Sequence, residues 1–453
     1  MSLKKNIIRI FSANFLIAIS GIIIGFVVPV ALSLDSYAYV KTYTLYMSYI
    51  GFLHLGFIDG MYIKYGGKNI DEIDKNIFKC EHNIFIVIQG LMTIIFLVIA
   101  ILDRNIIIFL MAISILPLNT VAFHKMFYQA TGEFKKFTKV SYIYTGIYLS
   151  TNLILVFLMK SNNYILYSIT MLIANIVVFI NLEYKFYKEY KEIKAEYYSD
   201  IWNNIRIGFY ILIANLSVLL FYGIDRWFVK IYYTINDFAY YSFAISMLSI
   251  VNIFISAISI IFYNYLSKGE DEKKIKSLKN YFIIIGAGAS FAYFGLSVIV
   301  NIFLKKYTPS LSIIAVSFAT YPYMIVINAL YINLYKSRKE EKKYLMVVML
   351  MLCVAIVYNF IGVYVFDDVI FIAIATLLAF ITWYLYSTRD FKYLKMDIKE
   401  GIYLIVILVM FIITSHMENY ILGAFVYLGI YFAMTILIYK DSIKEMISIA
   451  LKK

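Results

Sequence analysis

Long apolar runs, separated by short polar segments, fill this chain from end to end. A helix needs about 20 apolar residues to cross the hydrocarbon core of a bilayer, and the chain offers such a run repeatedly. The pattern predicts fourteen membrane-spanning helices, near residues 7–32, 38–63, 77–101, 105–129, 139–159, 164–184, 204–230, 237–265, 279–304, 310–335, 344–366, 369–388, 401–415 and 420–439. The first run is too long for the core of a signal peptide, so we interpret it as a retained span.

The composition supports the same class. Apolar residues make up 62% of the chain and charged residues 15%, and the mean hydropathy is +0.80. Soluble domains are closer to half apolar and a quarter charged. The sequence therefore predicts an all-α polytopic membrane protein with short loops and no sizeable extramembrane domain.

Basic residues gather at one set of helix ends. If the N-terminus is cytoplasmic, all but seven of the 41 Lys and Arg residues lie at internal ends, and the exceptions are Lys41, Arg104, Lys160, Arg226, Lys230, Lys305 and Lys306. The positive-inside rule then places both termini in the cytoplasm. It also accounts for the net charge of +13 without a nucleic-acid partner.

A polar segment divides the chain into two parts. In "KFYKEYKEIKAEYYSD", residues 185–200, apolar side chains recur at helical spacing, which predicts an amphipathic helix on the inner membrane surface. The predicted domains are a six-helix lobe at 1–184, this linker helix at 185–203, a second six-helix lobe at 204–390, and two accessory helices with a tail at 391–453.

The two lobes show signs of a duplication. A shift of 201 residues places Ala13-Asn14 on Ala214-Asn215, and a shift of 207 places "YQATGEFKKF" on "YKSRKEEKKY". Six spans precede the second copy, so both copies enter the membrane from the same side. The pattern predicts parallel repeats around a central cavity.

Three stretches carry a resemblance to a known family: "LGFIDGMYIKYG", "YQATGEFKKF" and "IDRWFVKIYYTINDFAYYSFA". They resemble bacterial polysaccharide flippases of the Wzx type, in the MOP (multidrug/oligosaccharidyl-lipid/polysaccharide) exporter superfamily. The resemblance implies that an undecaprenyl-diphosphate-linked oligosaccharide is moved from the inner to the outer leaflet of the bacterial cytoplasmic membrane. It also implies glycosyltransferase and polysaccharide polymerase partners, besides membrane lipids.

The candidate substrate site centres on cations in the seventh span. Arg226 and Lys230 are four residues apart and share a helix face, and Tyr222 and Asn215 extend this polar stripe. A charge inside the membrane is costly unless it faces water or a counter-ion, so we expect Arg226 to face the cavity and bind a diphosphate. For Lys230, snorkelling to the headgroups is an equal alternative. Asp225 is either a structural partner for a neighbouring helix or a substrate contact.

Further polar residues in the first lobe join the candidate site. They are Lys41, Asp59, His54, Lys125 and Asn14. Asp59 is a candidate proton or cation site, with a helix-end carboxylate as the alternative. His54 is either a titrating group or a packed neutral histidine. Lys125 meets an anionic headgroup or snorkels, and Asn14 forms hydrogen bonds between helices by default.

No catalytic motif occurs in the chain, and nothing in the sequence indicates a metal or cofactor site. We therefore expect a transporter and not an enzyme. An oligosaccharide polymerase or ligase would present a large external loop, which this chain lacks. A drug or cation exporter of the same superfamily remains the alternative, since it would share the fold but need no diphosphate-binding cations.

Overall fold

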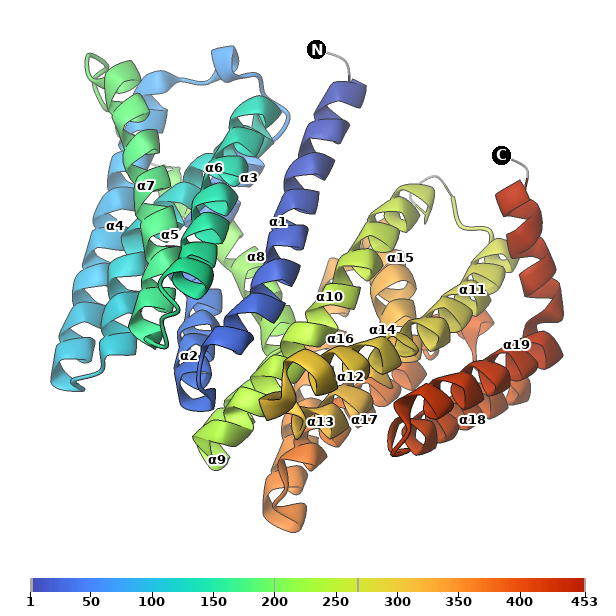
Figure 1. Cartoon of the computed structure of the whole chain (residues 1–453). Coiled ribbons are helices and arrows are strands. Elements are labelled where there is room, and N and C mark those ends of the chain that lie inside the picture. The colour runs from blue at the N-terminus through green and yellow to red at the C-terminus, as the bar shows by residue number, and fades with distance from the viewer. Residues whose placement is uncertain (1–2, 199, 267–268, 452–453) are drawn as a thin grey trace. The chain divides into compact units, whose positions relative to one another are not determined.

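In a computed structural model, residues 3–198, 200–266 and 269–451 are described, apart from the side chains of 3–8, 10, 251–254, 256–265, 447 and 449–451. Every regular element in these ranges is a helix (Figure 1). The chain forms two compact units, Met1–Leu216 and Ser217–Lys453. The boundary falls inside the helix α8, Ile201–Phe221.

Five long helices, α1, α4, α5, α6 and α7, form the body of the first unit. α5 packs against α4, α6 and α7, and α1 packs against α6 (Figure 1). The elements are α1 Leu3–Ala31, α2 Leu34–Ile50, η1 Gly51–His54, α3 Phe57–Tyr65, η2 Ile70–Glu72, α4 Lys75–Leu102, α5 Ile106–Ala130, α6 Phe134–Leu153, η3 Ile154–Leu158 and α7 Tyr164–Tyr190. Side chains of Asp74, Asn105 and Asn163 accept hydrogen bonds from the first free N–H groups of α4, α5 and α7, and this fixes where these helices begin.

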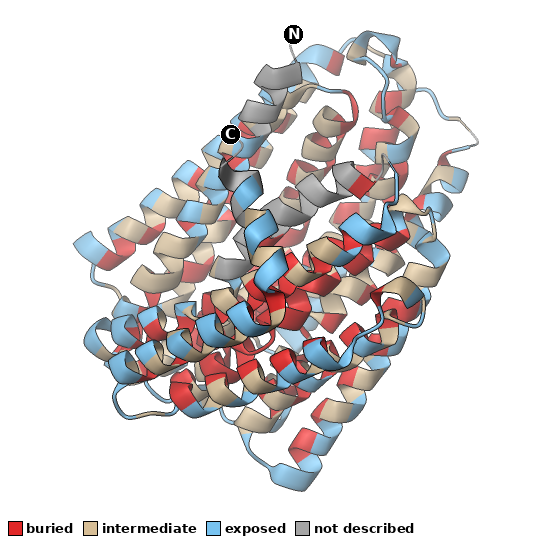
Figure 2. Ribbon diagram, turned by 90° about the vertical axis from the view of Figure 1, so that its right-hand side faces the viewer, coloured by how far each residue is buried: buried red, intermediate tan, exposed pale blue. Residues whose placement is uncertain are grey.

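The outer face of α4 is apolar and exposed. Five side chains at helical spacing are exposed by 50 to 64%, namely Val87, Leu91, Ile94, Val98 and Ile101. The same alternation of exposed and buried positions runs along the other long helices (Figure 2). An exposed apolar stripe of this length is a liability in water, but it suits a helix that faces lipid.

The second unit contains the remaining helices. Its main pairs are α11 with α14, α10 with α13, α16 with α17, and α18 with α19. The elements are α9 Ile224–Tyr232, α10 Ile235–Leu266, α11 Glu272–Ser290, α12 Ala292–Phe303, η4 Lys305–Tyr307, α13 Ser310–Phe318, α14 Tyr321–Val326, η5 Ile327–Tyr331, α15 Ile332–Ser337, α16 Glu341–Ile361, η6 Gly362–Phe366, α17 Val369–Ser387, η7 Lys392–Leu394, α18 Ile398–Ser415 and α19 Tyr420–Leu451.

The predicted fold class is confirmed. Within the described residues, 11 helices are long and apolar enough to cross a membrane, or 12 if the bent pair Ser310–Phe318 and Tyr321–Ser337 is one span. Each of them coincides with one of the fourteen predicted spans. The other two predicted spans correspond to the interrupted run α2–η1–α3 and to α10.

The predicted linker helix at 185–203 is not formed as such. α7 continues to Tyr190, and residues 194–198 have no helical structure before α8 begins at Ile201. Phe186 and Tyr190 stack on each other inside α7, with ring centroids 4.4 Å apart. The apolar spacing that predicted a separate helix therefore belongs to the last turns of α7, where it packs against the core of the unit.

A buried ion pair fastens α18 to the rest of the second unit. The Lys279 ammonium on α11 donates hydrogen bonds of 2.6 and 2.8 Å to the two carboxylate oxygens of Glu400 on α18. It also donates to the carbonyl of Leu394 at 2.8 Å, and Tyr384 on α17 donates to Glu400. α18 is thus tied to the unit by specific polar contacts in addition to apolar packing.

Candidate functional site

The cationic segment of the seventh predicted span follows a break in the helix. α8 ends at Phe221, and α9 begins at Ile224 after Gly223, which has φ −135° and ψ −2°. Tyr222 and Asn215 therefore do not share one continuous helical face with Arg226 and Lys230, contrary to the sequence prediction. The Tyr222 hydroxyl instead donates a 2.6 Å hydrogen bond to the Asn328 side-chain oxygen in η5.

Asp225 is buried and fully engaged in local contacts. One carboxylate oxygen accepts a 2.8 Å hydrogen bond from the Tyr241 hydroxyl on α10. The other accepts the backbone N–H of Arg226 at 2.7 Å. The contact with Tyr241 joins α9 to α10, which corresponds to the first of the two sequence interpretations of Asp225.

Arg226 has a buried nitrogen without a protein acceptor. Its Nε atom is buried and makes no hydrogen bond to any described residue. Leaving such a donor unsatisfied costs about 1–3 kcal/mol, so an acceptor from outside the protein would be favourable here. One turn further on, the Lys230 Nζ lies 5.4 Å from the centre of the Phe238 ring, and its side chain is partly buried.

The second predicted span is broken near its middle. Leu55 and Gly56 adopt positive φ angles of 53° and 84°. The break frees backbone carbonyls, and two side chains from other helices satisfy them: Asn119 donates to the Ile50 carbonyl at 3.2 Å, and Gln89 donates to the Leu53 carbonyl at 3.3 Å. Irregular backbone at membrane depth is tolerated where protein groups satisfy it in this way.

His54 and Asp59 meet at this break. The His54 Nε2 lies 3.6 Å from Asp59 Oδ2, and His54 Nδ1 accepts the Gly56 N–H at 3.1 Å. Because Nδ1 accepts a hydrogen bond, the proton of the neutral ring sits on Nε2 and faces the carboxylate. Both side chains are partly buried. The structure thus brings together two residues that the sequence analysis proposed separately.

Glycines allow α3 and α8 to approach very closely beside the break. A Cβ atom on Gly208 would lie 2.0 Å from the Gly56 carbonyl oxygen, and one on Gly60 would lie 2.2 Å from the Asn204 carbonyl oxygen. The sequence analysis did not identify this contact. The signal was present in "GFIDG", where two glycines are four residues apart, a spacing typical of close helix packing.

The remaining candidates lie apart within the first unit. Lys125 lines a pocket of about 450 Å³ together with Gln129 and Asn175, and its Nζ is 5.0 Å from the centre of the Phe137 ring. Lys41 lies over the Tyr37 ring at 5.1 Å. Asn14 on α1 and Asn215 on α8 are exposed. Of the ten predicted residues, Tyr222, Asp225, Arg226 and Lys230 belong to the second unit and the other six to the first.

A cluster of two histidines and a glutamate escaped the sequence analysis altogether. His82 on α4 and His124 on α5 place their Nε2 atoms 3.1 and 2.9 Å from the same oxygen of Glu183 on α7. Both histidines are buried, and Glu183 is partly buried. The only signal in the sequence was that two of the four histidines of the chain lie toward the lysine-rich ends of predicted spans.

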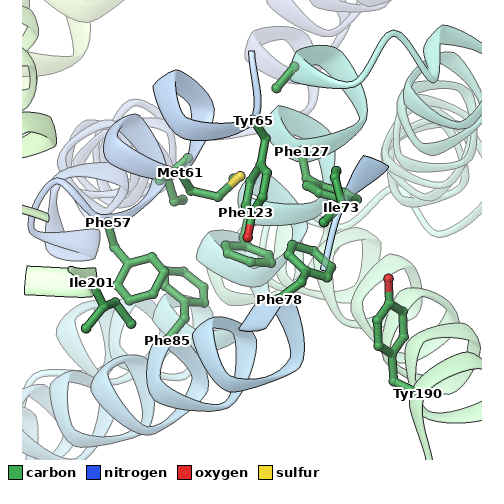
Figure 3. Close-up of a cluster of buried hydrophobic side chains, with 12 residues drawn as sticks. Phe57, Met61, Tyr65, Ile73, Phe78, Phe85, Phe123, Phe127, Tyr190 and Ile201 are labelled. Atoms are coloured by element: carbon green, nitrogen blue, oxygen red, sulfur yellow. The ribbon is translucent and has the colours of Figure 1, made fainter. Parts of the chain in front are cut away.

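An aromatic core supports this cluster. Phe78, Phe85, Phe123 and Phe127 pack together (Figure 3). The Phe123 ring centre lies 5.8 Å from that of His82 and 5.6 Å from that of His124. The Phe186 ring stacks on the His82 imidazole, with centroids 3.8 Å apart and planes inclined by 27°. These contacts fix the orientation of the imidazole rings before any ligand binds.

A second carboxylate, Glu81, is buried beside the same core. It accepts hydrogen bonds from Lys64 at 2.7 Å, from Tyr65 at 2.6 Å and from Tyr198 at 2.6 Å. Burial and the hydrogen bond to Glu81 raise the pKa of the Tyr198 phenol above its usual range. Since each oxygen of Glu81 has a donor, this group holds the segment after α7 against α3 and α4.

No protein-family model matches the sequence, and no curated protein sequence matches it. Solved structures do match it by fold. A structure described as "Lipid II flippase MurJ, inward closed conformation" matches with a TM-score of 0.68 and 14% identity, over 97% of this chain and 99% of that chain. An inward-facing multidrug resistance MATE family transporter of the MOP superfamily matches with a TM-score of 0.55 and 14% identity, over 84% of this chain and 98% of that chain. The chain is therefore a multi-pass membrane protein with the fold found in the MurJ flippase and in MATE transporters of the MOP superfamily.

Proposed function

We propose that this protein is a flippase that moves an undecaprenyl-diphosphate-linked oligosaccharide from the inner to the outer leaflet of the bacterial cytoplasmic membrane, for the assembly of a surface polysaccharide. Two lines support the proposal. The fold is similar over nearly the whole chain to that of a protein described as a lipid II flippase. The chain also places an arginine and a lysine one turn apart on α9, the short helix that follows the break in the seventh predicted span.

The buried, unpartnered Nε of Arg226 is the observation that carries the proposal. A guanidinium group presents several N–H donors in one plane and binds phosphate oxygens in pairs. Its charge cannot be removed by deprotonation, so the partly buried Arg226 side chain keeps a positive charge that attracts an anion. The diphosphate of a lipid-linked substrate would supply the missing acceptor, and Lys230 would add a second positive charge within one helical turn.

A drug or cation exporter of the same superfamily is the second candidate, and the similarity to a MATE transporter supports it. Such an exporter needs an anionic group that is free to bind a cation. The buried Asp225 already accepts two hydrogen bonds. Asp59 faces His54, and it is the carboxylate on which the exporter hypothesis would depend.

A transport assay with both substrate classes separates the two candidates. The purified chain would be reconstituted into liposomes that contain a fluorescent undecaprenyl-diphosphate oligosaccharide, and its transfer between leaflets would be followed by quenching from outside. We expect Arg226→Ala to reduce the rate by roughly 10- to 150-fold, since a hydrogen bond to a charged group contributes about 1.5–3 kcal/mol. Arg226→Lys restores part of the rate, because an ammonium provides charge without the planar donor array.

The matched control is Arg104→Gln, at an exposed arginine in the turn after α4. It keeps the wild-type rate. Equal rates for Arg226→Ala and wild type at equal protein content would contradict the role of Arg226. Transport of organic cations without any transfer of the lipid would favour the exporter.

We further propose that the chain has no catalytic activity, and that glycosyltransferases act before it and a polymerase after it in polysaccharide assembly. We also propose that both termini are cytoplasmic. The orientation follows from the distribution of basic residues. In a background without Cys80 and Cys353, a cysteine introduced at Glu270 or Ile193 is expected to react only with membrane-permeant reagents. Labelling of either position by an impermeant reagent from outside the cell would contradict this orientation and indicate the opposite one.

A further inference from the structure

The His82–His124–Glu183 cluster brings together three side chains that commonly bind transition metals. Their ligand atoms all lie within 4.8 Å of one another. Among the residues that the structure describes, no other three or more His, Cys, Asp or Glu side chains converge in this way. The three residues come from three different helices, α4, α5 and α7, and His82 and Glu183 are 101 positions apart in the chain.

The spacing of the ligand atoms fits a tetrahedral ion. Bonds of about 2.0–2.1 Å from zinc to nitrogen or oxygen place neighbouring ligand atoms of a tetrahedron about 3.3 Å apart. The two Nε2 atoms lie 3.1 and 2.9 Å from the Glu183 oxygen. To admit the ion, each Nε2 atom would have to move a few tenths of an ångström away from the Glu183 oxygen. The two Nε2 atoms, which lie within 4.8 Å of each other, would have to come to about 3.3 Å apart.

The surroundings give the ion access and an open position. His82 and Glu183 line a pocket of about 530 Å³ at the surface of the first unit. Three protein ligands leave one tetrahedral position for water or for a ligand in this pocket. Lys79 also lines the pocket. Its ammonium donates hydrogen bonds to the carbonyls of Tyr190 and Ile193 at 2.8 and 2.7 Å.

A hydrogen-bonded network without a metal is the alternative explanation for this cluster. If each neutral imidazole donates its Nε2 proton to Glu183, both donors share one oxygen. The buried Nδ1 atom of His82 has no hydrogen-bond partner among the described residues, and this holds with or without a metal on Nε2. A metal ion would instead accept the Nε2 lone pairs of both imidazoles, and its positive charge would balance the negative charge of the Glu183 carboxylate.

We propose that His82, His124 and Glu183 form a binding site for a divalent transition-metal ion of the zinc class. Imidazole and carboxylate ligands suit Zn²⁺, and nickel, copper and cobalt ions bind to similar sets. The ion would join α4, α5 and α7 near their lysine-rich ends. Its role is to hold these three helices together, and the proposal is independent of the substrate that the protein transports.

The test uses the full chain, purified without a polyhistidine tag, treated with a chelator and carrying Cys80→Ser to remove the nearest thiol. Zn²⁺ is titrated calorimetrically, and Co²⁺ is used as a probe because a tetrahedral site gives strong visible absorption. We expect one ion per chain. His82→Gln or His124→Gln should weaken binding by more than about 100-fold, since even the loss of an outer partner of a metal ligand costs about 10- to 100-fold.

The control is His416→Gln, which changes an exposed histidine at the end of α18 and should leave binding unchanged. Added Zn²⁺ should raise the unfolding temperature of the wild-type chain and of this control, but not of Glu183→Gln. Absence of stoichiometric binding by the chain with both histidines intact, or equal binding by His82→Gln and the His416→Gln control, would overturn the proposal.

Discussion

Replacing Lys279 by methionine is expected to destabilise the second unit strongly. Methionine keeps most of the length and volume of the lysine side chain but removes its charge. The Lys279 and Glu400 side chains are only 2% and 7% exposed. After the substitution, Glu400 loses both hydrogen bonds from the ammonium and keeps the one from Tyr384. A buried carboxylate is then left without its counter-ion.

Loss of one partner of a buried ion pair lowers the free energy of unfolding by about 3–5 kcal/mol. If the second unit unfolds cooperatively, roughly 2–4 °C per kcal/mol converts this into a decrease in unfolding temperature of about 6–20 °C. Glu400→Gln should have a similar effect, because it leaves a buried ammonium. The double variant Lys279→Met/Glu400→Gln should recover at least half of the loss, since no unpaired charge remains.

The assay is thermal unfolding of the detergent-purified chain, followed by size-exclusion chromatography with fluorescence detection. Lys276→Met is the matched control, because Lys276 lies on the same helix three residues earlier and is exposed. It should unfold at the wild-type temperature. If Lys279→Met unfolds within about 2 °C of this control, the pair contributes no more than an exposed ion pair does, and the argument from burial is wrong.

Three further predictions concern other parts of the chain. Gly208→Ala should greatly reduce the yield of folded protein, because the added Cβ would lie 2.0 Å from the carbonyl oxygen of Gly56, just before α3. Gly429→Ala should be tolerated, because its Cβ would meet nothing within 4 Å, and equal yields of the two variants would contradict the close contact. Asn119→Leu should cost about 1–3 kcal/mol in the free energy of unfolding by leaving a buried carbonyl without a donor, and unchanged stability in chemical denaturation would refute this. The Arg338 guanidinium lowers the pKa of Glu270. The free energy of unfolding of wild type should therefore exceed that of Glu270→Gln by about 1 kcal/mol, as for a partly exposed pair, above about pH 4.3. This difference should disappear as the pH falls through the lowered pKa, and a difference that persists at lower pH would argue against the pairing.

The sequence alone determined the class of the protein and the positions of its spans. Whether a segment enters a bilayer depends on the composition of about 20 consecutive residues, and this information is local. The sequence also showed a polar, cationic stretch around Arg226. It misplaced the linker helix at 185–203, because apolar residues at helical spacing look the same in a surface helix and in the last turns of a span such as α7.

Only the tertiary structure decided which polar groups meet. His124 and Glu183 are 59 positions apart, and Lys279 and Glu400 are 121 apart, so their contacts depend on which faces of distant helices pack together. The break at Leu55 and Gly56 is likewise stable because Asn119 and Gln89 reach its freed carbonyls from other helices. Hydrophobicity acts on each segment separately, whereas a hydrogen bond or an ion pair requires two groups within about 3 Å of each other, and the packing of the helices sets that distance.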